Sequence, residues 1–92
     1  MHISRMDLNL FVVLETIYSE GNITRASQKL NLTQPAVSHA LGRLRDLLKD
    51  PLFVRQGANM VATPFTRNII TPVRHALQTL ELSVSEHQQF DP

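Results

Sequence analysis

The chain has 92 residues, of which 42% are hydrophobic and 5% aromatic, and it carries a formal net charge of +1. This length suits one small domain with an appended helix and excludes a large two-domain enzyme, and the apolar fraction excludes a disordered chain. The chain contains no cysteine, which rules out a disulfide framework, a thiolate zinc site and a cysteine nucleophile.

Charge is distributed unevenly along the chain. Residues 22–80 include eight basic and two acidic residues, so this segment carries +6, and the other acidic residues lie on either side of it. A basic middle with acidic flanks predicts a surface that binds a polyanion. No apolar run approaches the roughly 20 residues of a membrane helix, and residues 1–7 lack the apolar core of a secretory signal. We therefore expect a cytoplasmic protein with no membrane partner.

Two helices are predicted in the first third of the chain. An apolar pattern follows Asp7, a plausible N-cap, for about three turns and stops at Gly21. This pattern is apolar around more than half of the helix circumference, so the helix needs packing partners on two sides. Residues 23–30 then repeat apolar side chains at helical spacing, and either Asn22 or Thr24 can accept the free N–H groups at their start.

The third predicted helix covers residues 34–48. Thr33 is its N-cap, Pro35 lies in the first turn, where a missing N–H costs nothing, and Asp50-Pro51 ends the helix. Its core stripe consists of Val37, Leu41, Leu44 and Leu48. Its opposite face carries Gln34, Ser38, Gly42 and Arg45, flanked by His39 and Arg43. Two short helices joined by a tight turn, the second with such a polar face, predict a helix-turn-helix.

A β-hairpin and a long helix complete the predicted fold. Strand-like runs at 52–55 and 60–63 surround a turn at residues 56–59. Thr63-Pro64 then opens a helix whose apolar stripe extends past the small core, so self-association is expected. The residues expected at a dimer interface are Ile69, Val73, Ala76, Leu77, Leu80 and Val84. The sequence thus predicts a mainly α fold: a winged helix-turn-helix over residues 1–63, with three helices and a two-stranded β wing, followed by a linker and dimerisation helix over residues 64–92.

Side chains on the third helix suit the reading of double-stranded DNA. The major groove admits one helix, whose N-terminal turns reach the base edges. The amide of Gln34 can pair with adenine N6 and N7, and Ser38, one turn later, can bond a base or a phosphate. Further candidates for base or phosphate contacts are Thr24, Arg25, Thr33, His39, Arg43 and Arg45 on the helices, and Arg55, Gln56 and Asn59 on the wing. We expect helix 34–48 in the major groove and the wing near 56–59 on the adjacent minor groove or backbone.

Other classes of function fit these residues less well. Ser38 and His39 point about 100° apart on a helix, and no acid is placed to orient the imidazole, so an enzyme is not expected. The histidines, His2, His39, His75 and His87, lack metal-ligand spacing, so no metal or other cofactor is expected within this chain. One alternative is a helical protein-interaction module that uses the last helix, although such a module has no need for a charge of +6. Another is a different winged-helix regulator.

The residue order also resembles that of the LysR-type transcriptional regulators, over nearly the whole chain. The matching residues are Leu8 and Phe11, Ile23-Thr24-Arg25-Ala26, Leu30-Asn31-Leu32-Thr33-Gln34-Pro35-Ala36-Val37-Ser38, Leu41 and Leu44, and Asp50-Pro51-Leu52-Phe53-Val54-Arg55. The chain departs from the usual family pattern at Ser27, His39, Arg45 and Lys49. Its Arg45-Asp46 and Asp50-Pro51 pairs look like those of the branch that includes nodulation-gene regulators.

The resemblance implies DNA contacts at seven positions: Thr24, Thr33, Gln34, Pro35, Ser38, Arg43 and Arg55. It also implies a homodimer paired through the long helix, a tetramer in the full-length protein, and a larger effector domain that binds a small-molecule co-inducer. That domain is absent from this chain, so we expect a fragment cut at the end of the linker helix. A two-fold dimer predicts a pseudo-palindromic operator with one half-site for each recognition helix.

Overall fold

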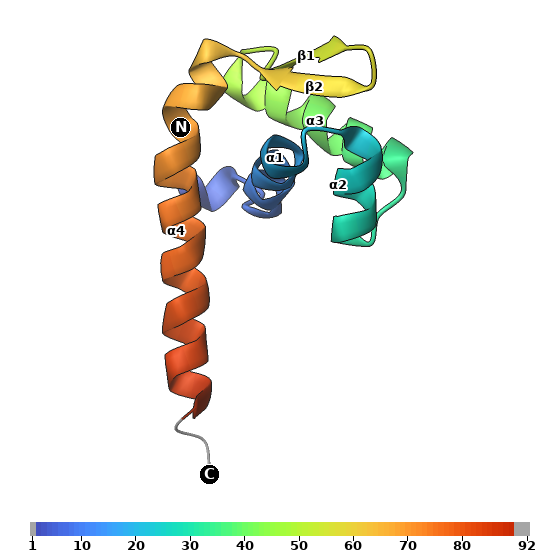
Figure 1. Ribbon diagram of the computed structural model, residues 1–92. Helices are drawn as coiled ribbons and strands as arrows, with labels where there is room; N and C mark the ends of the chain where they lie inside the picture. The colour runs from blue at the N-terminus through green and yellow to red at the C-terminus, as the bar shows by residue number, and fades with distance from the viewer. Residues whose placement is uncertain (1, 90–92) are drawn as a thin grey trace.

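A head of three helices and a β-hairpin lies at one end of a long C-terminal helix in the computed structural model, which describes residues 2–89 (Figure 1). In chain order the elements are η1 (Ile3–Arg5), α1 (Asn9–Glu20), α2 (Ile23–Leu30), α3 (Gln34–Leu48), β1 (Phe53–Gln56), β2 (Asn59–Ala62) and α4 (Pro64–Gln89). This order confirms the predicted winged helix-turn-helix followed by a long helix. No helix within the described residues has the length and apolar content of a membrane span.

Side-chain caps and left-handed residues set the ends of the three head helices. The side-chain oxygen of Asn22 accepts the N–H of Arg25 at 3.0 Å, so Asn22 is the cap of α2. The hydroxyl of Thr33 accepts the N–H of Ala36 at 3.2 Å, so Thr33 is the cap of α3. The three helices end at residues with positive φ, namely Gly21 (68°), Asn31 (57°) and Lys49 (54°).

The start of α1 differs slightly from the prediction. The residue before the helix is Leu8, which already has helical φ and ψ and makes no side-chain cap bond. The Asp7 carboxylate nevertheless accepts the N–H of Asn9 at 3.0 Å. It therefore satisfies one of the free N–H groups at the start of α1, although it lies one residue before the cap position.

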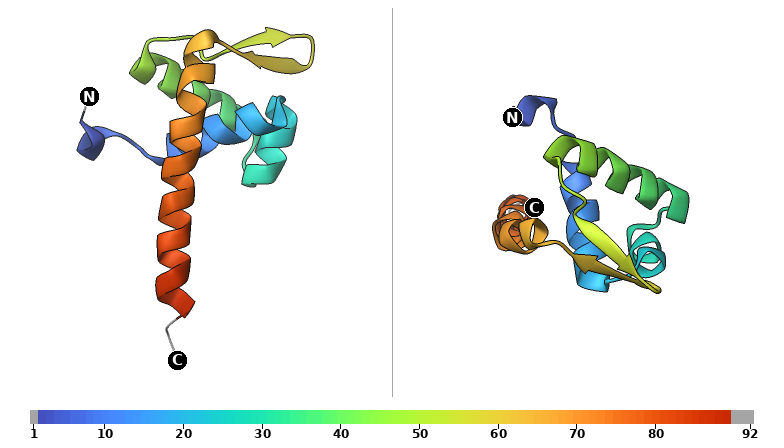
Figure 2. Two further views of the ribbon diagram at one scale, coloured as in Figure 1. Left: turned by 60° about the vertical axis from the view of Figure 1, so that its left-hand side comes forward. Right: turned by 90° about the horizontal axis from the view of Figure 1, so that it is seen from above.

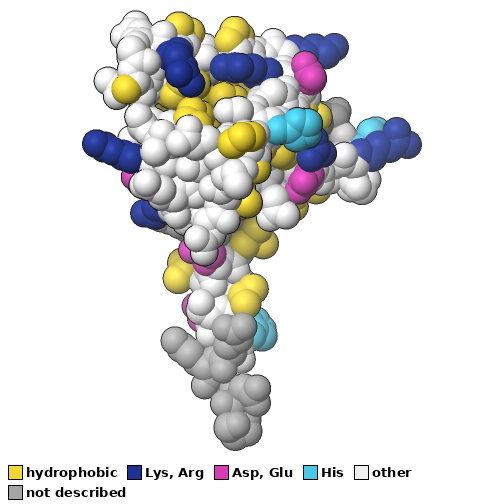
Figure 3. Space-filling view, turned by 90° about the vertical axis from the view of Figure 1, so that its right-hand side faces the viewer, with side chains coloured by type: hydrophobic (Ala, Val, Ile, Leu, Met, Phe, Trp, Pro, Cys, Tyr) yellow, Lys and Arg dark blue, Asp and Glu magenta, His cyan; other side chains and the backbone are white. Residues whose placement is uncertain are grey.

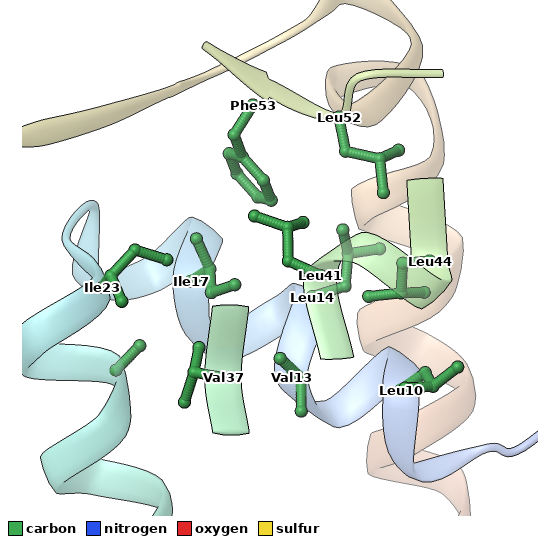
Figure 4. Packing of buried hydrophobic residues seen from close by; sticks show 11 residues of the cluster. Leu10, Val13, Leu14, Ile17, Ile23, Val37, Leu41, Leu44, Leu52 and Phe53 are labelled. Atoms are coloured by element: carbon green, nitrogen blue, oxygen red, sulfur yellow. The ribbon is translucent and has the colours of Figure 1, made fainter. Parts of the chain in front are cut away.

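The core lies where α1 meets α3 and the first residues of the hairpin. Helix α1 contributes Leu10, Val13, Leu14 and Ile17, α3 contributes Val37, Leu41 and Leu44, and Leu52 and Phe53 close the core from above (Figure 4). Leu48, the last residue of the predicted stripe on α3, is only half-buried and packs against the edge of this cluster. Because the buried residues of α3 all lie on one side, its opposite side is free to face solvent.

The wing is a tighter hairpin than the sequence predicts. Strands β1 and β2 are antiparallel, and Gln56 pairs with Asn59 at the end of the ladder. The turn therefore contains two residues, Gly57 and Ala58, and not four. Gly57 has a φ of 61° at the first turn position, as in a type II′ turn, which glycine adopts without strain. Asn59 is of a residue type common in turns and Gln56 is polar, so the sequence pattern alone put both residues in the turn.

A strained residue joins α3 to the wing. Leu52 is fully buried with a φ of 66°, and the N–H of Phe53 donates to the carbonyl of Pro51 at 2.7 Å, which closes a γ-turn around Leu52. Left-handed φ is unfavourable for a leucine, so neighbouring groups must hold it. The Asp50 carboxylate accepts the N–H of Leu52 at 2.8 Å, and the buried hydroxyl of Thr66 donates to the Leu52 carbonyl at 2.8 Å.

Asp50 also reaches the start of α4, because its carboxylate accepts the hydroxyl of Thr63 at 2.7 Å. We expect Asp50→Ala to lower the free energy of unfolding by about 2 kcal/mol, since two bonds to a half-buried carboxylate are lost. Urea unfolding followed by circular dichroism measures this change. Asp46→Ala, at an exposed position of α3, is the control and should change the value by less than about 0.5 kcal/mol. Equal effects of the two substitutions would show that the Asp50 bonds do not stabilise the junction.

A cluster of polar contacts fixes the direction of α4 relative to α1. The guanidinium of Arg74 lies over the ring of Tyr18, 4.9 Å from its centroid. Its Nε lies 3.1 Å from Glu15 Oε2, and its Nη2 donates to Ser19 Oγ at 3.0 Å. We call these four residues the Arg74 clasp. Ile70, one turn earlier on α4, is buried. Beyond these residues α4 projects from the head, which gives the molecule extents of 50 × 30 × 21 Å.

Candidate nucleic-acid interface

The N-terminal half of α3 presents polar side chains to solvent on a rigid support. Gln34, Pro35, Ser38 and His39 are exposed, whereas Val37, between them in the sequence, is fully buried. This alternation follows from the helical period, because the buried stripe faces α1 and the polar positions face outward. The structure thus brings four of the predicted contact residues together at the exposed end of one helix.

The N-terminus of α2 supplies two more of the predicted contacts. Thr24 and Arg25 are both exposed, and they lie in the first turn of a helix that Asn22 caps. Thr33, the cap of α3, is exposed as well. Free N–H groups at the starts of helices favour phosphate oxygens. The two helix starts therefore flank the polar side of α3 with groups suited to an anion.

The wing lies beside the N-terminus of α2 in the ribbon views of the molecule (Figures 1 and 2). Arg55, Gln56 and Asn59 are exposed on it, so all three predicted wing residues are accessible. Asn22 reaches this hairpin, since its Nδ2 donates to the carbonyl of Ala58 at 2.7 Å. From the sequence, Asn22 is expected only as one of two possible caps of α2, the other being Thr24. Its second partner lies 36 residues away, and no local signal in the sequence points to it.

Arg43 and Arg45, two residues apart on α3, have different roles. Arg43 is exposed, and its guanidinium is 3.8 Å from the Asp7 carboxylate, which is the distance of a weak surface ion pair. Arg45 donates from Nε to the carbonyl of Pro51 at 2.7 Å and from Nη2 to that of Phe53 at 3.2 Å. The guanidinium of Arg45 thus holds the strained junction before the wing, a role that the sequence did not predict, and a DNA contact by this exposed residue stays a prediction.

The Lys and Arg side chains lie on the head and on α4 as far as Arg74, and not on the part of α4 beyond it. On the face that carries the exposed ends of α2, α3 and the wing, Lys and Arg side chains stand at several places around the head (Figure 3). After Arg74, α4 has no further Lys or Arg, and its charged side chains there are Glu81 and Glu86, apart from histidine. Of the eight basic residues in segment 22–80, six lie on the head, and Arg67 and Arg74 lie on the first half of α4. With its two acidic residues, segment 22–63 of the head therefore carries +4, at the end away from the acidic part of α4.

An apolar groove runs between α4 and the N-terminal segment. From α4 its lining residues are Val73, Ala76, Leu77 and Leu80, and from the opposite wall they are Ile3, Met6, Leu8 and Phe11. Four of the six predicted dimer-interface residues therefore line one groove. Val84 is exposed one turn beyond Leu80. Ile69 differs, because it is half-buried against the core of its own chain.

Residues 8–67 match the family model described as "Bacterial regulatory helix-turn-helix protein, lysR family". Nodulation protein D of Bradyrhizobium sp. (strain ANU 289) is 42% identical over 92 residues, which are 100% of this chain and 27% of that protein. The HTH-type transcriptional activator NagR of Ralstonia sp is also 42% identical over 92 residues, covering 100% of this chain and 31% of NagR. The chain therefore spans less than a third of these curated relatives, and their equal identity does not single out the nodulation branch.

Solved structures show the same fold. A probable transcriptional regulator from Pseudomonas aeruginosa matches with a TM-score of 0.88 and 39% identity, over 91% of this chain and 28% of that one. The DNA-binding domain of CbnR, in a complex with DNA, matches with a TM-score of 0.80 and 18% identity, over 91% of this chain and 97% of that one. At 18% identity the second likeness shows the fold alone. Together with the family match, these findings confirm the prediction of a regulator's helix-turn-helix and not an enzyme.

Proposed function

Because the chain belongs to the lysR family of bacterial regulatory helix-turn-helix proteins, we propose that its head binds double-stranded DNA sequence-specifically, with α3 in the major groove and the wing on the adjacent minor groove or backbone. The observation that carries this proposal is the division of α3 into two sides. Val37, Leu41 and Leu44 fix the helix in the core, while Gln34 and Ser38 stand free on the side away from it. A side chain held in this way can enter a groove without loss of helix geometry.

Bases and phosphates would be contacted by different groups. The amide of Gln34 has a donor and an acceptor in one plane, which matches adenine N7 and N6 at the major-groove edge. The exposed guanidinium groups of Arg25, Arg43 and Arg55 suit phosphates, which supply most of the salt-dependent affinity. His39 is exposed beside Ser38 and is proposed as a further contact, to a phosphate or a base.

The functional form on DNA is proposed to be a homodimer on a pseudo-palindromic operator. The apolar groove beside α4 supports this, since Leu80 and Val84 are 57% and 55% exposed and continue the groove along the helix. Pairing two such helices would bury these side chains and fix two recognition helices at one separation. For the full-length protein we propose a tetramer in the cytoplasm and a further domain that binds a small-molecule co-inducer.

Selection of bound duplexes from a random pool, at low and at moderate salt, tests the function directly. Enrichment of an interrupted inverted repeat is the expected result. Retention that falls with salt but enriches no sequence would mean that the head binds phosphates and α3 reads no base. No retention even at low salt would overturn DNA binding and favour a protein-interaction module.

Gln34→Ala is expected to weaken binding to the selected duplex by roughly 1–3 kcal/mol and to relax base choice at one position in each half-site. The reason is that alanine keeps the helix but removes both hydrogen-bonding atoms. Competition binding with single-base variants of the duplex measures both effects. The control is Gln78→Ala at an exposed position of α4, which should change neither the affinity nor the preferred sequence. An equal loss on every duplex would mean that Gln34 contacts the DNA backbone and not a base.

A further inference from the structure

One amide side chain links the helix-turn-helix to the wing. Asn22 Oδ1 accepts the N–H of Arg25 at 3.0 Å, and Asn22 Nδ2 donates to the carbonyl of Ala58 at 2.7 Å. The orientation of this amide is unambiguous, because a backbone N–H requires the oxygen and a backbone carbonyl requires the nitrogen. The residue that starts α2 therefore also holds the turn of the hairpin.

A backbone bond next to Asn22 strengthens this link. The N–H of Met60 donates to the carbonyl of Gly21 at 2.9 Å, and Met60 pairs with Arg55 across the hairpin. Two consecutive residues at the corner between α1 and α2 thus bond to the wing at its turn and at the strand residue opposite Arg55. The same corner is seen beside the hairpin in the ribbon viewed from above (Figure 2).

The outer part of the wing has few other attachments. Val54 and Val61 are 53% and 39% exposed, and residues 55–59 are all exposed. An isolated two-stranded hairpin is only marginally stable in water, so its position depends on the contacts that hold it to the rest of the fold. On the inner side, Met60 packs against the core cluster. The hydrogen bonds to Gly21 and Asn22 then fix the direction in which the hairpin extends from the head.

We propose that Asn22 is a positioning residue for DNA binding: it holds the wing at a fixed distance from the start of α2, so that Arg55 and the N-terminal turn of α2 meet the same duplex. This inference rests on the proposed function. Because one amide makes both bonds, a shift of the wing also strains the cap of α2. Asn22 itself need not touch DNA for this effect.

Asn22→Ser separates the two roles of the side chain. The serine hydroxyl keeps the cap acceptor for Arg25, but it is one atom shorter and has no second polar atom for Ala58. On the selected duplex we expect about a fivefold loss of affinity, the size of one net hydrogen bond. We also expect a salt slope smaller by about 1 per protomer, as for a lost phosphate contact. Hydrogen exchange at the Met60 N–H should become faster.

The decisive comparison uses Arg55→Ala alone and combined with Asn22→Ser. If Asn22 acts by placing Arg55, the serine substitution costs no further affinity once Arg55 is absent. Asn68→Ser, at an exposed position on α4, is the matched control and should bind as the unsubstituted chain does. Thermal unfolding of each variant shows whether the head remains folded. Asn22→Ala removes the cap as well, so its additional loss of affinity relative to Asn22→Ser measures the effect of the cap.

Failure of this inference differs from failure of the proposed function. Additive losses from Asn22→Ser and Arg55→Ala would show that Asn22 acts through α2 and not through the wing. An unchanged affinity and unchanged Met60 exchange in Asn22→Ser would also overturn the positioning role while leaving DNA binding intact. If Arg55→Ala alone leaves the salt slope unchanged, the wing contact and the role of Asn22 in placing it both fall. Base reading by α3 is then still judged by Gln34→Ala.

Discussion

Leu80→Asp is expected to convert the dimer into a monomer and to lower affinity for a two-half-site operator by roughly 100-fold or more. Leu80 lies at the edge of the apolar groove with 57% of its surface exposed, so its burial would have to come from a second chain. A carboxylate buried there without a partner is unfavourable. Sedimentation velocity measures the assembly state. Binding to a single half-site should change little, because Leu80 is not among the residues proposed to contact DNA.

Leu82→Asp is the matched control for this experiment. Leu82 is 64% exposed and lies two residues farther along α4, so it points about 200° away from Leu80 around the helix. The Leu82→Asp chain should sediment as a dimer. A monomer produced by Leu82→Asp and not by Leu80→Asp would place the interface on the other side of α4. Dimers in both variants would remove α4 from the interface altogether.

Phe53→Ala is expected to lower the free energy of unfolding by about 4 kcal/mol. Phe53 is 2% exposed and reaches from β1 towards the α1 and α3 side chains of the core (Figure 4). Its removal leaves a cavity in a small core that has few other large side chains to refill it. Since small domains are stable by only about 5–15 kcal/mol, this loss is a large part of the total. Urea unfolding measures it.

The neighbouring residue on the same strand provides the control. Val54 points to the other side of the hairpin and is 53% exposed, so Val54→Ala should cost less than about 1 kcal/mol. Comparable losses from Phe53→Ala and Val54→Ala would mean that strand propensity, and not core packing, sets the stability of β1. The pair therefore tests whether the wing is joined to the core through Phe53.

The sequence predicted those parts of the fold that depend on local pattern. Helical periodicity located α3 at its observed bounds, and Thr33 with Pro35 marked its start because capping acts within one turn. The exposure of Gln34 and Ser38 followed from the same period. The wing was placed correctly but its turn was too long, because Gln56 and Asn59 have polar side chains whether they lie in a turn or pair across strands.

Contacts between distant segments could not be predicted in the same way. The charge of Arg45 suggested an anion as its partner, but the structure supplies the carbonyls of Pro51 and Phe53. These acceptors depend on the left-handed conformation of Leu52, which leucine rarely adopts and which no residue propensity would indicate. The bond from Asn22 to Ala58 depends on how the hairpin folds back over the head, which is a property of the tertiary structure.

Because the Arg74 clasp sets the angle between α4 and α1, a small change of that angle moves the far end of α4. From Arg74 the helix continues to Gln89, about 22 Å at 1.5 Å per residue, so a tilt of about 10° displaces its far end by about 4 Å. That displacement is close to the rise of one base-pair step, about 3.4 Å. The Arg74 and Glu15 side chains are 41% and 27% exposed, so dissolved ions weaken the pair and soften the pivot. In the proposed dimer, the stiffness of the Arg74 clasp would therefore set how readily the two heads adapt to half-sites whose spacing differs by one base pair.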